Sequence, residues 1–445
     1  MRGLIAKFIL LALMTLSFSA FSQEWIEGRR TGEGPGINAG NNVVLHLGLG
    51  VEGGYNSNVL RRSEDMTTQN VEGAGRIRIS PYLDLGTRSM AERVEDTGVA
   101  DATPPKVEFS LGVGAYYDHY FSSDSAVSDQ NNVGINTHFD LVVLPMRPLS
   151  FLADVAYVRT IEPYESTYDQ WGSNRIKPGV GLRIRPGGGT LSFEIGYRAD
   201  LILYEEDEIA ERNDNLGNEV RFLTSWKVLP KTMLIQRTRF SPIVYLGDLN
   251  SSDATRVNVN SFPVRAELGI QGLFSEKYGL SLFAGYGGSF YQEGDDFDSI
   301  IASLEFKFYI TPASNLRIGG ERDFVDSYYG NFFSKNGGYL SFEQMIANIV
   351  LLTLKGDVFY RAYSEYDLGD EDNLDPGETR SELWIGATLF VEARATKWLS
   401  FNVSCNYQGN ISDYAYLYTN LAGQVDQYPV DFNRVEIMGG ARVYY

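Results

Sequence analysis

The chain ends in the segment FNRVEIMGGARVYY (Phe432–Tyr445), whose side chains alternate between two kinds. In an extended strand, alternate residues point to opposite faces. One face would hold Val435, Ile437, Gly439, Ala441, Val443 and Tyr445, and the other would hold Arg434, Glu436, Met438, Gly440, Arg442 and Tyr444. A strand of a soluble sheet can alternate in the same way, but a terminal strand that ends on an aromatic residue is typical of a bacterial outer-membrane barrel.

The same alternation recurs along the whole chain, for example over Leu191–Leu203, Ala302–Ile310 and Leu383–Val391. Nine longer polar segments alternate with eight tight connections, although the connection near Thr87–Lys106 is long where a short turn is expected. Seventeen connections imply about 18 strands. We therefore predict an all-β fold, a transmembrane antiparallel up-and-down barrel with no plug domain and with both termini in the periplasm.

The N-terminal residues 1–22 have the pattern of a secretory signal peptide. Arg2 and Lys7 precede an apolar run over Phe8–Phe18, and small residues precede Gln23. Residues 23–41 are expected to form a short periplasmic lead-in that is too small to fold alone, and residues 42–445 to form the barrel. No later apolar run reaches about 18 residues, so membrane-spanning helices are not expected.

Composition limits the partners and the chemistry. The whole chain carries 57 Asp and Glu against 38 Lys and Arg, so nucleic acid is not an expected partner. Cys405 is the single cysteine and cannot form an intramolecular disulfide. The acidic stretch Glu365–Glu378 lacks the oxygen spacing of an EF-hand loop, so neither a metal nor any other cofactor is predicted.

No catalytic residue is predicted either. The chain has three histidines and no G-x-S-x-G motif, which leaves a Ser-His site near His119 as the one enzymatic alternative. The chain is expected not to be an enzyme.

If the apolar rows face lipid, the alternate rows line the bore, and their chemistry indicates what passes. A basic cluster is predicted at Lys177, Arg183, Arg185 and Arg198, and acidic lumen positions at Asp118, Asp140, Asp154, Glu194 and Glu305. Mixed charge suits a hydrated polar solute, and the basic cluster could attract an anionic solute or polymer. The alternative is that these charges pair across neighbouring strands and stiffen the wall.

Tyrosines are also expected on the inner face, with Tyr82, Tyr116, Tyr120, Tyr309 and Tyr363 as the candidates. Aromatic faces can stack on the apolar faces of sugar rings. The alternative is that they are girdle or packing residues.

The segment LGLGVEGGYNSNV (Leu47–Val59) resembles the first strand of the putative β-barrel porin 2 family, which commonly ends in Tyr-Asp-Ser-Asn-Val. The matching residues are Tyr55, Asn56, Ser57 and Asn58, with Asn56 where the family usually has Asp. Read from the residues alone, the motif is a membrane-belt tyrosine followed by an Asn-rich turn.

Length, signal peptide and strand count are similar to the barrels of this group that are encoded with exopolysaccharide secretion systems, notably in myxobacteria. The resemblance implies an exit channel for a polysaccharide chain in the outer membrane of a Gram-negative bacterium. It also implies a periplasmic export protein and a copolymerase as partners, with outer-membrane lipid and lipopolysaccharide around the barrel. The alternatives are a passive diffusion porin for small hydrophilic solutes, and an adhesin or structural barrel that acts through its acidic loops.

Overall fold

The computed structural model describes residues 34, 36–39, 42–65, 70–87, 106–161, 172–247, 258–327, 330–364, 379–419 and 425–445. The proposed signal peptide lies outside these residues. Within these residues strands dominate, and the helical pieces are α3 (Ser125–Ser128), α4 (Asp207–Asn213) and a short 3₁₀ turn at Pro186–Gly188. Among the described residues, no helix combines the length and the apolar character needed to cross a membrane.

One main sheet of twenty hydrogen-bonded strands contains the barrel. Two of its members are short additions, β1 (Ile37–Asn38) and β11 (Ile243–Tyr245). Strand β11 continues β10, because both pair with β9 and β12 and Pro242, which has no N–H, interrupts the ladder between them. Eighteen barrel strands remain, as the alternation predicts.

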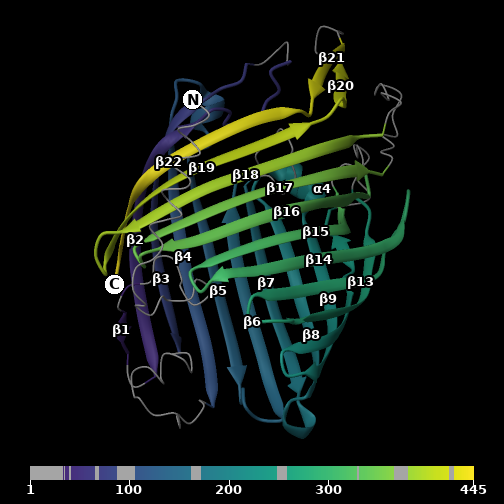
Figure 1. Ribbon diagram of the computed structural model, residues 1–445. Helices are drawn as coiled ribbons and strands as arrows, with labels where there is room; N and C mark the ends of the chain where they lie inside the picture. The colour runs from purple at the N-terminus through teal and green to yellow at the C-terminus, as the bar shows by residue number, and fades with distance from the viewer. Residues whose placement is uncertain are drawn as a thin grey trace, which may run out of the picture.

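The eighteen strands follow one another around the barrel, and each pairs with its neighbours in antiparallel fashion. They are β2 (Val43–Asn56), β3 (Ala74–Thr87), β4 (Val107–Phe121), β5 (Asn132–Val143), β6 (Leu149–Thr160), β7 (Ser173–Ile184), β8 (Leu191–Tyr204), β9 (Asn215–Leu229), β10 (Thr232–Phe240), β12 (Ser261–Leu273), β13 (Tyr278–Tyr291), β14 (Phe297–Thr311), β15 (Ser314–Asp326), β16 (Phe332–Ile346), β17 (Val350–Tyr363), β18 (Ser381–Arg394), β19 (Leu399–Ile411) and β22 (Phe432–Tyr444). The strands of the near wall cross those of the far wall, as tilted barrel strands do (Figure 1).

The barrel closes where the first strand meets the last. Strand β2 pairs with β22 from Gly48, opposite Tyr444, to Asn56, opposite Glu436. The start of β2 extends beyond this pairing, and β1 covers the exposed edge there, with Ile37 opposite Leu45. The lead-in therefore adds a short edge strand to the barrel instead of remaining separate from it.

The two faces of the strands differ as the sequence predicts. On β22 the side chain of Ile437 is 52% exposed and that of Tyr444 is 1% exposed. Aliphatic and aromatic residues form the exposed rows, whereas charged side chains lie mostly on the inner rows. Because only closed barrels and helices satisfy all backbone groups in lipid, this apolar exterior places the protein in the outer membrane.

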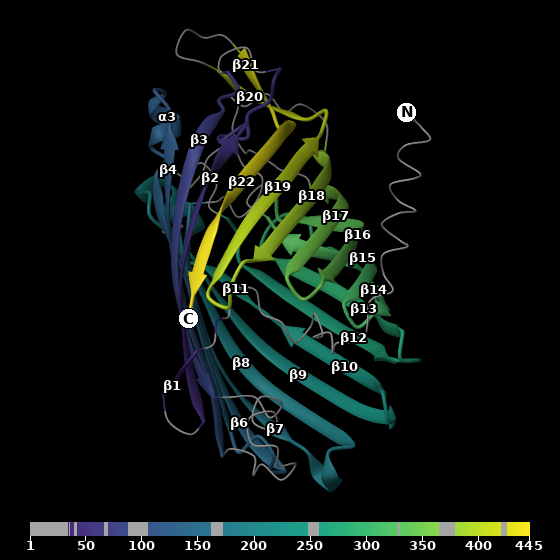
Figure 2. The ribbon, with the colours of Figure 1, turned by 60° about the vertical axis from the view of Figure 1, so that its left-hand side comes forward.

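Longer and shorter connections alternate between the two ends of the barrel. The loop end carries residues 57–73, 122–131, 161–172, 205–214, 246–260, 292–296, 327–331, 364–380 and 412–431. The turn end carries 88–106, 144–148, 185–190, 230–231, 274–277, 312–313, 347–349 and 395–398. The C-terminus lies at the turn end, away from α3 and from the hairpin of β20 (Ala415–Thr419) and β21 (Val425–Pro429) (Figure 2).

Outward tyrosines mark a level near the loop end. Three of them donate a hydrogen bond from the hydroxyl to an asparagine on the next strand of the barrel. The pairs are Tyr157–Asn174 at 2.8 Å, Tyr197–Asn218 at 2.6 Å and Tyr407–Asn433 at 2.7 Å. An amphipathic ring with a satisfied hydroxyl suits the boundary between lipid and water, so we take these tyrosines as the aromatic girdle at this end.

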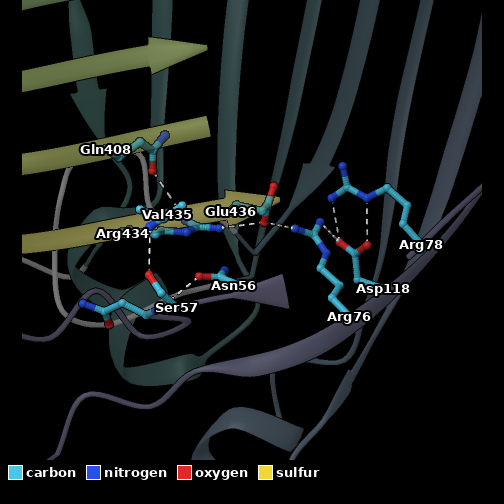
Figure 3. A network of polar contacts seen from close by, with 10 residues as sticks. Asn56, Ser57, Arg76, Arg78, Asp118, Gln408, Arg434, Val435 and Glu436 are labelled. Atoms are coloured by element: carbon cyan, nitrogen blue, oxygen red, sulfur yellow. Dashed lines mark hydrogen bonds and ion pairs between the residues drawn. The ribbon is translucent and has the colours of Figure 1, made fainter. Parts of the chain in front are cut away.

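The segment that resembles the porin 2 family lies at the seam between β2 and β22. Tyr55 points outward, 54% exposed, as a belt residue does. The Ser57 backbone N–H donates to the carbonyl of Val435, and the Ser57 hydroxyl accepts from the Val435 N–H (Figure 3). Asn58, only 1% exposed, donates through Nδ2 to the carbonyls of Arg62 and Asn433.

Asn56 completes the turn, since its side chain accepts from the Asn58 N–H at 3.1 Å. The motif therefore ties the first strand, through its loop, to the last.

Replacing Asn58 by Ala should weaken this seam. The variant loses two donated bonds and the bond accepted from the Arg62 N–H, all of them partly buried. We expect a loss of about 2 kcal/mol in the free energy of unfolding, measured by urea titration of the reconstituted protein. N70A, at an exposed position of the same loop, should change it little. Equal stability of N58A and N70A would contradict the proposed role.

Candidate functional site

The inner wall is the candidate functional surface, and one hollow in it lies against β7 to β12 and β15. This hollow has a volume of about 420 Å³, and its lining includes Arg175, Lys177, Arg198, Arg239 and Arg265. A second hollow of about 500 Å³ reaches towards β4 to β6 and shares Arg175 and Lys177 with the first. The bore beside these strands is therefore lined by polar and charged groups.

The predicted basic cluster lies on the inner face, and the structure gives each of its members a partner. Arg198 forms an ion pair of 2.6 Å with Asp154, and Arg183 one of 3.0 Å with Glu194. Lys177 lies 3.5 Å from Asp200, and Arg185 donates to the Ser150 hydroxyl at 3.2 Å. The structure thus favours the alternative in which these charges pair across strands.

Two arginines outside the predicted cluster complete this network. Arg175 pairs with Asp200 at 2.5 Å, and Arg221 lies 3.7 Å from both Asp154 and Glu194. The alternation of side chains along the strand would have identified Arg175, because it is two residues before Lys177 and therefore on the same face of β7. Arg221 needed the register of β8 and β9, which places it opposite Gly196.

A second network crosses the seam at the loop end, and Asp118 lies at its centre. Asp118 accepts from Arg76 at 2.7 Å and from two nitrogens of Arg78, both at 2.7 Å. Arg76 also binds Glu436 of β22, which Arg434 approaches to 3.3 Å (Figure 3). Because Arg76 is opposite Gly54, its side chain passes over β2 and joins β3 to the last strand.

The other predicted lumen acids differ in their surroundings. Glu305 accepts a hydrogen bond of 2.6 Å from the hydroxyl of Tyr339. Asp140 is exposed and lies opposite Asp154 in the register of β5 and β6. Among the described residues, none forms an ion pair with Asp140. The wall at β5 therefore presents a carboxylate to the bore.

Several inward aromatic rings lie over a glycine of the neighbouring strand. Tyr82 is opposite Gly48, and Tyr116 is opposite Gly134. A Cβ atom at either glycine would collide with the tyrosine ring. The guanidinium of Arg78 covers the Tyr116 ring at 4.3 Å from its centroid. The rings thus lie along the wall, as in pairs where an aromatic residue compensates for a strand glycine.

The remaining predicted tyrosines are mostly parts of the wall. Tyr120 is buried in a cluster with Val59, Leu60, Ala74 and Val127. Tyr363, 5% exposed, donates to Glu382 at 3.3 Å. Tyr309 is half-buried on β14, opposite Asn315 near the turn end. For Tyr120 and Tyr363 the structure favours packing over contact with a solute.

The acidic loops are only partly described. Glu205, just beyond β8, accepts from Arg159 at 2.7 Å and from Asn174 at 2.9 Å, and the Arg159 guanidinium holds the pKa of Glu205 below its usual value. Residues 365–378 lie outside the described part of the chain. Within that part, no group of three or more His, Cys, Asp or Glu side chains has a metal-binding arrangement.

Comparisons with known proteins found solved barrels of similar length. OpdK of Pseudomonas aeruginosa, solved with vanillate, has 10% identity and a TM-score of 0.45, over 90% of this chain and 99% of that one. A BenF-like porin from Pseudomonas fluorescens Pf-5 has 10% identity and a TM-score of 0.48, over 91% and 99%. OccAB3 of Acinetobacter baumannii has 11% identity and a TM-score of 0.44, over 90% and 99%.

No family model and no curated protein sequence matches the chain. These comparisons therefore give no support to the resemblance to the porin 2 family, and the fold is established by the strand pairing of this chain.

Replacing Asp154 by Asn should change the ion selectivity of the bore. Arg198 and Arg221 then lose a carboxylate partner. A unit charge changes the energy of an ion about 4 Å away by about 1 kcal/mol in water, which corresponds to roughly a fivefold change in the local ion concentration. We expect the chloride-to-potassium permeability ratio to rise by up to that factor, measured from reversal potentials in a planar bilayer. D129N removes the same charge from an exposed loop position and serves as the control. An unchanged ratio in D154N would show that the network does not face the ion path.

Replacing Gly134 by Ala should destabilise the barrel by about 1–3 kcal/mol, because the added methyl group collides with the Tyr116 ring. G114A adds a methyl group at a position where it would make only an ordinary van der Waals contact, so this variant should lose less stability. Urea unfolding would compare the two variants. The double variant G134A/Y116A should be less destabilised than the sum of the single changes, and simple additivity would argue against the ring-on-glycine contact.

Proposed function

We propose that the protein is a passive channel through which small hydrophilic solutes cross the outer membrane. The observation that supports this proposal most is the composition of the inner wall between β6 and β12. Its charges are numerous and of both signs, and Asp154, Glu194 and Asp200 each pair with basic side chains beside them. A hydrated wall of mixed charge, paired across its strands, suits polar solutes.

The orientation is also a proposal. In outer-membrane barrels the longer loops face the outside and the short turns face the periplasm. Applied to this chain, the rule places the loop end outside and both termini in the periplasm.

Export of a polysaccharide, the leading expectation from the sequence, is the second candidate. The rings that lie along the wall favour it, since Tyr82 and Tyr339 each cover a glycine of the adjacent strand. Aromatic faces of this kind are the groups on which sugar rings stack. A periplasmic export protein and a copolymerase would belong to this candidate only. An adhesin acting through the acidic loops is the third.

Conductance in a planar bilayer distinguishes the first two candidates. We expect the purified protein to give a stable current with weak selectivity between potassium and chloride. In liposomes it should admit monosaccharides and amino acids faster than longer oligosaccharides. Current that long polysaccharide blocks, together with no uptake of small solutes, would instead favour export. A protein without conductance and without solute uptake would contradict the channel proposal.

A further inference from the structure

Charged residues are scarce on the outward rows of the described strands. Those present are Arg159, Asp298 and Arg322, all close to the loop end. Arg159 is balanced by its ion pair with Glu205. Asp298 is opposite Gly288, and the hydroxyl of Tyr286 lies over that glycine. Arg322 has no carboxylate within 4.0 Å among the described residues, although it is exposed.

The Arg322 guanidinium is nevertheless held in one position. Nε donates to the carbonyl of Ile300 at 3.1 Å, Nη1 to Asn336 Oδ1 at 2.7 Å and Nη2 to the Ser299 hydroxyl at 2.9 Å. A guanidinium has five N–H donors and stays charged at any physiological pH. Three donors are used here, so two remain for a ligand on the outer surface.

The register gives the depth of this group in the membrane. Arg322 is opposite Asn336, which is opposite Tyr360, and Tyr360 points outward with 48% exposure. Arg322 therefore lies at the level of an outward tyrosine, a few residues before the end of β15 at Asp326. A cation at such an interface costs about 0–1 kcal/mol, far less than at the centre of the bilayer.

We propose that Arg322 binds a phosphate group of lipopolysaccharide in the outer leaflet. A fixed guanidinium with free donors matches the oxygens of a phosphate, which accept charge-assisted hydrogen bonds. The outward rows beside it, with Ile300 70% exposed and Leu340 46% exposed, supply apolar surface for acyl chains. The inference depends on the proposed orientation of the loop end but not on transport activity.

Native mass spectrometry of the folded protein in a phosphate-free detergent tests the proposal, with lipid A and enzymatically dephosphorylated lipid A as probes. R322Q should bind lipid A about tenfold more weakly than the unmodified chain, the effect of one charge-assisted hydrogen bond. Both proteins should bind dephosphorylated lipid A equally. R147Q makes the same charge change in an exposed connection at the turn end and should leave lipid A binding unchanged.

Two results would overturn the proposal. One is equal binding of lipid A by R322Q and the unmodified chain, with both shown to be folded by their electrophoretic shift on heating. The other is displacement of lipid A by inorganic phosphate at equal concentration, which would indicate a site for the free ion. Because conductance is measured separately, a channel that conducts but does not bind lipid A would contradict this inference alone.

Discussion

Backbone hydrogen bonding in lipid is the constraint on which the structure depends. Every N–H and C=O group of a membrane-spanning strand needs a partner within the protein, because hydrocarbon offers none. Eighteen strands meet this need only when β22 pairs with β2. The seam is therefore where additional bonds matter most, and Asn58 and the Arg76–Glu436 ion pair lie there. The motif at Tyr55–Asn58 has a structural explanation that requires no ligand.

The inner wall is governed by a related constraint. Arginine side chains that line a barrel need compensation, and a carboxylate on a nearby strand supplies it at most positions described above. Asp118, Asp154, Glu194 and Asp200 each serve one or more arginines or lysines. The wall is consequently rich in charges that pair across strands, which makes it both stiff and hydrated.

Much of the fold could be predicted from the sequence, because a period of two residues distinguishes the lipid face from the lumen face within each strand. The same rule fails where a strand is irregular. By parity Phe324 should face lipid, yet it is 1% exposed and stacks on Phe297 at 4.4 Å between ring centroids. Its neighbour Asp323 also points inward and pairs with Arg265 of β12, three strands away across β13 and β14.

Such contacts depend on the curvature of the wall, which no local pattern encodes. For the same reason, the sequence could not predict which residue each member of the basic cluster pairs with, because this depends on the register of four strands. The tyrosines show a second limit of prediction from the sequence. Parity placed them on the inner face, but whether a ring projects or lies flat is decided by the glycine opposite it, as at Gly134.

The seam also sets the order of assembly. Asn58 and Asn433 are bonded although 375 positions separate them along the chain. Until the final strand has been delivered to the membrane, the opening strand has no partner on that side, and a chain interrupted during translocation would keep two bare edges in lipid. Closure of the barrel is thus a single late step. Until then, an assembly factor would be needed to cover the unpaired edge of the first strand.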